Sequence, residues 1–188
     1  SSVSPTEVAS DAGGNETFTI NGSRFSRGAI VKFVSNNGTE ITASTVTVVS
    51  PTQLTAVIAK SSFVNAQEPY DVKVVSAAGL QATLSDQINV DNAPSWTTAA
   101  GSLGTIEETA TGNHFTVAAT DAEGDTVSYS LQSGSLAGLS LDSSTGVISG
   151  DPTDVSSDTT NSFTLRATAG SKNSDRAFSY ITTNSIAL

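Results

Sequence analysis

"ETFTINGSRFSRGAIVKFV", residues 16–34, contains two candidate strands with turn residues between them. In the first strand apolar residues alternate with polar ones, and in the second Val31 and Phe33 are two residues apart, so each strand places these side chains on one face. Four of these apolar residues are expected in a core: Phe18, Ile20, Val31 and Phe33. Asn21-Gly22 follows the first strand, and this dipeptide readily takes the positive φ angles of a tight turn. The stretch therefore predicts β-structure.

Candidate strands continue on both sides of this stretch. In the first half they cover residues 41–49, 53–59, 70–76 and 80–90. In the second half they cover residues 114–121, 125–131, 138–142, 146–150, 161–169 and 176–182. Strands at a spacing of roughly 8 to 12 residues with turn signals between them predict β-sandwiches, and no apolar pattern keeps a helical period for three turns. The second core is expected to contain Phe115, Val117, Leu141, Ile148, Phe163 and Leu165.

"NVDNAPSW", residues 89–96, lies near the middle of the chain and marks a domain boundary. The 188 residues are enough for two domains of about 100 residues. Residues 1–90 carry seven acids against five bases, whereas residues 91–188 carry eleven acids against three bases. This shift in charge supports two domains, 1–90 and 91–188. Ala93-Pro94 is expected to stiffen the joint, because proline fixes its own φ and favours an extended preceding residue.

Composition excludes several classes of function. The chain has no cysteine, so disulfides, thiolate metal sites and cysteine catalysis are excluded. Its formal net charge of −10 argues against nucleic acid as a partner, because a binder needs a basic surface to displace counterions from phosphates. No apolar run approaches the roughly 18 residues of a membrane span, so no membrane insertion is expected.

The first half contains a series of motifs: Ser4-Pro5, "FTINGSRF", "AIVKF", "SPTQLTAVI" and "YDVKVVSAAG". By these motifs it resembles the IPT/TIG immunoglobulin-like domain across residues 3–90. The resemblance implies a β-sandwich that serves as a spacer, adhesive or dimerising module and has no catalytic residues.

The second half contains four motifs in order: "NAPSW", "VAATDAEGDTVSYSL", "GLSLDSSTGVISGDPT" and "SFTLRATAG". By these motifs it resembles a cadherin-like domain of the putative-Ig type, which occurs in bacterial surface proteins and phage virion proteins. Together the two resemblances imply an all-β fold of two tandem immunoglobulin-like β-sandwiches joined by a short linker.

The cadherin-like resemblance also implies a calcium site at the joint. Its candidate ligands are Asp91 with Asn92, Glu107 or its neighbour Glu108, and Asp121 with Glu123, while Asp125 adds charge nearby. Calcium takes six to eight oxygen ligands, so several of these groups must converge. The chain departs from the full motif in that Ile88 and Val90 replace acids of the linker and Ala169 stands where many such repeats carry an Asp. The alternative is that residues 121–125 form a solvated acidic turn and no ion is bound.

Two other residues could serve in binding or catalysis, but a structural role explains each of them more simply. Trp96 directly follows the linker and is expected to fill the interface or plug the end of the second core. His114 lies beside Phe115 in a candidate strand and is expected to be structural.

We expect a non-enzymatic structural or interaction protein of an extracellular assembly, in a phage virion or on a prokaryotic cell surface. Its partners would be neighbouring subunits or copies of itself. One alternative is an adhesin that binds cell-surface carbohydrate through loops of the second domain. Another is a pair of accessory domains of a secreted hydrolase.

Overall fold

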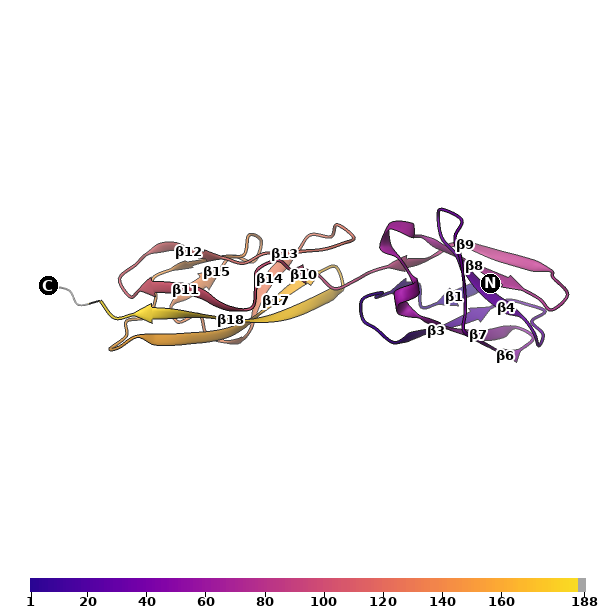
Figure 1. Cartoon of the computed structure of the whole chain (residues 1–188), viewed down its shortest axis with the longest axis horizontal. Coiled ribbons are helices and arrows are strands. Elements are labelled where there is room, and N and C mark those ends of the chain that lie inside the picture. The colour runs from indigo at the N-terminus through magenta and orange to yellow at the C-terminus, as the bar shows by residue number, and fades with distance from the viewer. Residues whose placement is uncertain (186–188) are drawn as a thin grey trace. The chain divides into compact units, whose positions relative to one another are not determined.

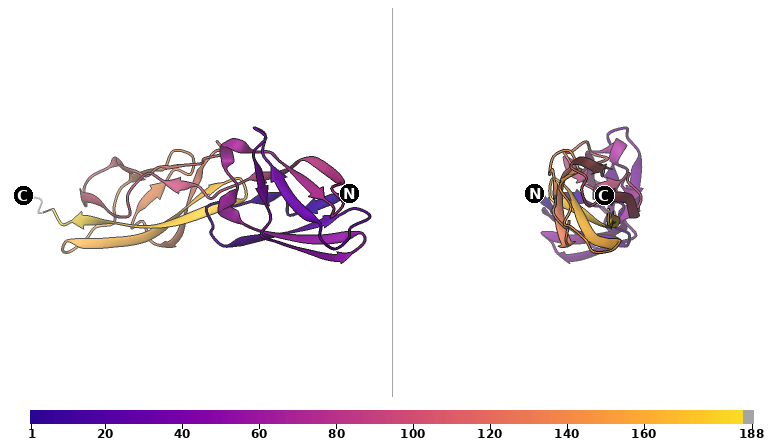
Figure 2. Two further views of the ribbon diagram at one scale, coloured as in Figure 1. Left: turned by 45° about the vertical axis from the view of Figure 1, so that its right-hand side comes forward. Right: turned by 90° about the vertical axis from the view of Figure 1, so that its left-hand side faces the viewer.

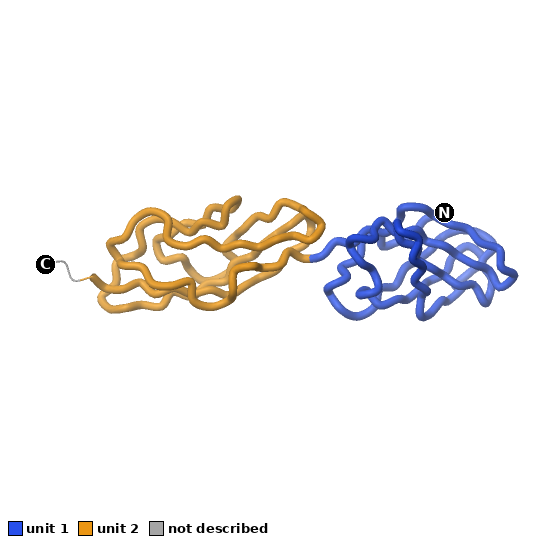
Figure 3. Tube along the Cα trace, turned by 45° about the horizontal axis from the view of Figure 1, so that its top comes forward, with its two compact units in different colours: residues 1–92 blue, residues 93–188 orange. Residues whose placement is uncertain are grey.

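The computed structural model describes residues 1–185, which form strands and two short 3-10 helices (Figure 1). The chain divides into two compact units, Ser1–Asn92 and Ala93–Leu188, called unit 1 and unit 2 (Figure 3). The division falls after Asn92, two residues beyond the expected boundary. Among the described residues, no helix is long and apolar enough to cross a membrane.

Unit 1 consists of two sheets, which Figure 2 shows from further directions. Its elements are β1 (Ser2–Ser4), β2 (Glu7–Val8), β3 (Asn15–Asn21), β4 (Ile30–Val34), β5 (Glu40–Thr42), β6 (Thr45–Ser50), β7 (Gln53–Ala59), η1 (Lys60–Ser62), η2 (Asn65–Gln67), β8 (Tyr70–Val75) and β9 (Gln81–Val90). One sheet has the strand order β1-β3-β7-β6 and the other β2-β9-β8-β4-β5. All neighbours are antiparallel except β2 and β9, which run parallel.

The Asn21-Gly22 dipeptide does not form the expected tight turn. β3 and β4 belong to different sheets, so residues 22–29 carry the chain from one sheet to the other. Gly22 is absent from the residues with positive φ, and its N–H donates to the carbonyl of Thr52. A Cβ on Gly22 would lie 2.7 Å from Cζ of Phe25, so a larger residue here would require the tip of the Phe25 ring to move.

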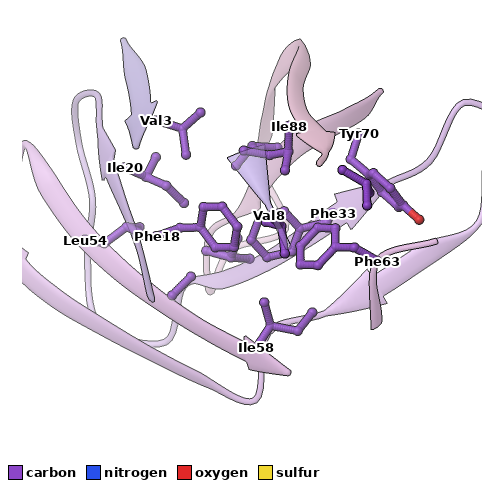
Figure 4. Close-up of a cluster of buried hydrophobic side chains, with 14 residues drawn as sticks. Val3, Val8, Phe18, Ile20, Phe33, Leu54, Ile58, Phe63, Tyr70 and Ile88 are labelled. Carbon is purple, nitrogen blue, oxygen red and sulfur yellow. The ribbon is translucent and has the colours of Figure 1, made fainter. Parts of the chain in front are cut away.

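Aromatic rings fill the centre of unit 1 (Figure 4). The ring centroids of Phe18 and Phe33 are 4.7 Å apart, and Phe63 lies 5.2 Å from Phe33 and 5.1 Å from Tyr70. Tilted and edge-on rings at such distances stabilise a core beyond the area that they bury. All four core residues predicted for this half are buried.

Unit 2 has two main sheets and a short two-stranded ribbon. Its strands are β10 (Ser95–Trp96), β11 (Gly101–Glu107), β12 (Gly112–Thr116), β13 (Ala119–Thr120), β14 (Ser128–Gly134), β15 (Leu139–Leu141), β16 (Val147–Gly150), β17 (Thr159–Ala169) and β18 (Lys172–Thr183). The sheets have the orders β11-β18-β17-β14 and β12-β16-β15, and β10 pairs with β13. The β11 and β18 pair is parallel.

The core of unit 2 lies between its sheets. Four of the six predicted residues are buried: Val117, Ile148, Phe163 and Leu165. Phe115 and Leu141 are only partly buried and pack against the edge of this cluster. Trp96 plugs the core, with its ring 5.3 Å from that of Phe178 and its indole N–H donating to the carbonyl of Ser174 at 3.2 Å.

Candidate functional site

The acidic turn of residues 121–125 directly follows β13. Because Ser95 pairs with Thr120, the turn lies at the end of unit 2 where the chain enters. Oδ1 of Asp121 accepts the backbone N–H groups of Glu123 and Asp125, both at 3.1 Å. An Asp carboxylate that accepts backbone N–H groups from residues two and four positions later in the chain holds the loop in a turn, as a backbone carbonyl would. The first role of Asp121 is therefore to fold this loop.

The other carboxylate oxygen of Asp121 has a different environment. Oδ2 is buried and has no hydrogen-bond partner among the described residues. Buried polar atoms are nearly always satisfied, so this oxygen calls for an ordered water or a cation as its partner. Among the predicted ligands, this atom gives the clearest structural argument for a bound ion.

The β17–β18 hairpin lies against the same turn. A Cβ on Gly170 would lie 2.7 Å from Oδ2 of Asp125, so the Asp125 carboxylate rests close to the tip of this hairpin. Ala169 is 1% exposed and forms part of the buried face of β17. The position at which the cadherin-like motif carries a carboxylate is thus occupied by a buried methyl group.

Glu107 and Glu108 do not belong to this turn. Glu107 pairs with Thr183 at the end of β18. The acidic turn lies near the start of β18, because Ala119, just before the turn, pairs with Trp96, and Trp96 bonds to Ser174. Ser174 and Thr183 are nine residues apart, and at 3.3 Å for each residue of strand this is a distance of about 30 Å. The structure therefore corrects the predicted ligand set, because Glu107 cannot share an ion with Asp121 and Glu123.

Glu108 has a structural role at that far end. Its carboxylate accepts the backbone N–H groups of Val155 at 2.8 Å and Ser185 at 3.1 Å, and the side-chain amide of Asn184 at 3.3 Å. These hydrogen bonds, led by the one from Val155, lower the pKa of the Glu108 carboxyl. Glu108 therefore ties the 151–158 loop to the end of β18.

Asp91 and Asn92 belong to unit 1. Asn92 Oδ1 accepts the hydroxyl of Ser10 at 3.1 Å and the N–H of Asp11 at 3.2 Å. The backbone N–H of Asp91 donates to the carbonyl of Val8 at 2.9 Å. Both residues thus close the end of the first sandwich.

The remaining donors suit calcium in kind but are few in number. Within the described part of the chain, no three Asp, Glu or His side chains are grouped so that they could hold a metal ion. Asp121 and Glu123 share one turn, and two carboxylates are well short of the six to eight oxygens that calcium takes. Unit 2 by itself does not supply a complete site.

Two surface hollows are lined by uncharged side chains. One, of about 720 Å³, opens in unit 1 and is lined by residues that include Ile20, Phe25 and Leu84. The other, of about 590 Å³, lies over Ser162 and Ala177 in unit 2. Neither is lined by Asp, Glu, His, Lys or Arg. His114 is occupied elsewhere, with Nε2 3.0 Å from the carbonyl oxygen of Gly150.

Known proteins resemble the chain chiefly in fold. Residues 105–185 match the model of the family described as Putative Ig domain. This match lies within unit 2, and the IPT/TIG resemblance of residues 3–90 stays a prediction. A search of curated proteins finds no match.

Solved structures extend the resemblance to both units. A three-Ig fragment of titin, in an E-to-A mutated variant, is 14% identical with a TM-score of 0.51, over 95% of this chain and 62% of the fragment. The Protocadherin GammaB4 extracellular domain is 16% identical with a TM-score of 0.42, over 96% of this chain and 32% of that one.

An endo-fucoidan hydrolase from glycoside hydrolase family 107 is 13% identical with a TM-score of 0.40, over 96% of this chain and 28% of that one. The chain therefore spans less than two thirds of the length of each of these structures. At such identities the likeness concerns the fold alone. The chain is a tandem of two immunoglobulin-like β-sandwiches, and its second unit carries the match to the Putative Ig domain family.

Proposed function

We propose that the chain is a non-enzymatic structural and interaction module of an extracellular assembly, a phage virion or a prokaryotic surface fibre. The virion and surface contexts rest on the cadherin-like resemblance of the second half. The structure contributes a mechanical argument for the structural role and a chemical argument against catalysis.

The strand order near the two ends of each unit carries the proposal. In unit 1, Glu7 and Val8 of β2 pair in parallel with Asn89 and Val90 of β9. In unit 2, β11 pairs in parallel with β18, the last strand. In a parallel pair, the start of one strand and the end of the other lie at opposite ends of the pair. Force applied to the two ends of a unit therefore acts along these strands. It loads all the hydrogen bonds between them together and does not open them one at a time, which suits a load-bearing spacer.

The hollows support the non-catalytic part of the proposal. Hydrolysis of a glycoside needs a pair of carboxyl groups on either side of the bond. Neither hollow has an acid, a base or a nucleophile with an activating partner on its walls. The aromatic residues that could stack on a sugar are buried as well: Trp96, Tyr70, Tyr129 and Tyr180. This arrangement favours a structural module over a carbohydrate-binding adhesin.

The location can be tested by proteomics of the source organism. Purified virions and sheared surface fibres would be digested and searched for peptides from both units. We expect these peptides to be enriched in a particle or fibre fraction. Recovery only with cytosolic enzymes would overturn the proposal.

The type of activity can be tested with the purified chain. We expect no binding on a glycan array and no hydrolysis of a panel of polysaccharides. Specific glycan binding would favour the adhesin, and hydrolysis of any polysaccharide would refute a non-enzymatic role.

A further inference from the structure

The hollow in unit 1 lies at the end of that unit opposite to Asn92, which we call the head. β9 runs from Gln81 to Val90, so Ala82 and Leu84, which line the hollow, lie toward the far end of this strand. Ser2 lines it too and pairs with Asn21 at the end of β3. The walls of the hollow combine apolar side chains, among them Ile20, Phe25 and Val74, with polar ones, among them Asn21 and Thr83.

Apolar side chains are also exposed around the head. Leu80 is 76% exposed at the turn between β8 and β9, and Val49 is 58% exposed next to the β6–β7 turn. Ile30 is 45% exposed and pairs with Val75, the last residue of β8. Exposed apolar side chains beside a hollow with mixed polar and apolar walls suit a protein contact surface, which is about as apolar as the rest of a protein's surface.

Two arginines stand on the same end. Arg24 and Arg27 flank Phe25 in the loop of residues 22–29 and are exposed. Neither forms an ion pair with an acid among the described residues. Arg24 has φ of 62°, a conformation that disfavours any side chain relative to glycine. A long charged side chain at a position better suited to glycine points to a use for that side chain.

The acids of unit 1 lie away from the head. Glu7 pairs with Asn89, the N–H of Asp11 bonds to Asn92, and Glu68 accepts the N–H of Val90, all at the opposite end. Glu16 lies near the start of β3, opposite Ile58. Asp71 accepts the N–H of Asp86, and Glu40 pairs with Lys32 and Lys73. The head therefore carries positive charge on a chain whose net charge is −10.

The opposite charge gathers at the end of unit 2 farthest from Ala93, which we call the tail. Glu107 pairs with Thr183 there, and Asp158 accepts the N–H of Asn184. Asp151 and Asp154 lie in the exposed loop that Glu108 ties to the same end. Arg166 is paired with Asp175, and Lys172 and Arg176 lie near the start of β18, so no lysine or arginine of residues 93–185 lies at the tail. His114 lies near this loop, and its Nε2 is 3.0 Å from the carbonyl oxygen of Gly150. Five acids thus share the tail without a lysine or arginine.

We infer that copies of this chain associate head to tail, with the arginine-flanked hollow of unit 1 receiving the acidic 151–158 loop of a second copy. This inference deepens the proposed function by naming a second copy as the partner. The argument for that occupant is charge complementarity, because the head has two unpaired arginines and the tail has five acids. A contact between two different surfaces is heterologous, so it repeats along a filament unless it closes into a ring.

Two neutralising variants test the two surfaces separately. The head variant carries Arg24→Gly and Arg27→Ser, and glycine suits the left-handed backbone at position 24, so folding is preserved. The tail variant carries Asp151→Asn and Asp154→Asn. Sedimentation velocity of the unchanged chain should show concentration-dependent oligomers in about 0.01 M salt and their loss in about 1 M salt. The reason is that the Debye screening length falls from about 30 Å to about 3 Å between these salt concentrations. The association constant of each variant should be at least roughly tenfold lower than that of the unchanged chain, as expected when charges at a complementary interface are removed.

Mixing the variants gives the decisive result. The head variant keeps a native tail and the tail variant keeps a native head, so an equimolar mixture should form 1:1 dimers and stop there. A control with Lys60→Ser and Glu7→Gln, both away from the head, should associate like the unchanged chain. A chain that is monomeric in both salts, or a mixture that stays monomeric, would overturn the inference. Peptides recovered from particles together with a monomeric chain would refute this inference and leave the proposed function standing.

Discussion

Phe163 shows how strongly a single side chain of β17 supports unit 2. It is 3% exposed, and its ring lies 6.2 Å from that of Phe178 and 6.1 Å from that of Tyr180. Phe163→Ala should lower the free energy of unfolding of unit 2 by about 3 to 5 kcal/mol, because it leaves a cavity in a packed core. Urea denaturation followed by the fluorescence of Trp96, the only tryptophan, measures this change. Leu80→Ala, at an exposed position in unit 1, is the control, and a loss below about 1 kcal/mol for Phe163→Ala would contradict the assignment.

Glu40 carries a pH dependence that can be measured at one residue. Lys32 and Lys73 donate to its carboxylate at 2.6 and 2.8 Å and hold the pKa of Glu40 at about 2, below its ordinary 4.5. Because the pKa is lower in the folded state, the ion pairs stabilise unit 1 fully above about pH 4.5, and this contribution is lost as the pH falls toward 2. NMR titration of the Glu40 carboxyl carbon should give a midpoint near 2 that rises in Lys32→Ala. A midpoint near 4.5 in the unchanged chain would show that the lysines do not hold the carboxylate.

Asp121 allows the predicted calcium site to be tested atom by atom. One oxygen is committed to the turn and the other is buried without a partner, so at most a weak site is expected. Calorimetric titration of the chelator-treated chain should show calcium binding with a dissociation constant of about 1 mM, the range of weak extracellular modules. Asp121→Asn should abolish it, whereas Glu107→Gln should leave it unchanged. An absence of heat at millimolar calcium, or unchanged binding in Asp121→Asn, would leave the turn purely structural.

At the scale of elements, the predictions succeeded where apolar residues alternate and failed where glycine interrupts the pattern. The alternation in residues 161–169 and 176–182 lies within β17 and β18. β11 was missed, because its sequence GSLGTIE has two glycines and an exposed position at Thr105. Its place beside β18 is fixed by long-range pairing that no local pattern encodes. For the same reason, sequence spacing could not show that Glu107 lies at the opposite end of unit 2 from the acidic turn.

The parallel β11–β18 pair predicts how the two units respond to force. This pair has five residue pairs in register, whereas β2 and β9 have two, so unit 1 should unfold at the lower force in single-molecule pulling. Glu108 donates its N–H to the carbonyl of Thr183, and N–H directions alternate along an extended strand, so the N–H of Ile106 also points to β18. Ile106→Pro removes that donor and should lower the unfolding force of unit 2.

Ile106→Ala is the matched control for the pulling experiment. It removes more of the buried side chain than Ile106→Pro does but keeps the N–H, so a smaller loss of force in Ile106→Ala would assign the effect of proline to the lost hydrogen bond. Equal forces for the two variants would mean that the β11 hydrogen bonds do not carry the load.

At the scale of the whole molecule, the two cores predict independent folding. The core of unit 1 extends to Val90 and that of unit 2 begins at Trp96, and neither cluster of buried side chains contains a residue of the other unit. Chains of 92 and 96 residues exceed the roughly 40 residues below which a domain usually needs disulfides or metals. Residues 1–92 and 93–188, made separately, should each unfold in one cooperative transition with nearly the midpoint that it has in the full chain. Phe163→Ala should shift only the transition of residues 93–188. If residues 1–92 alone were unfolded, the first sandwich would depend on the second, and a boundary after Asn92 would not separate two folding units.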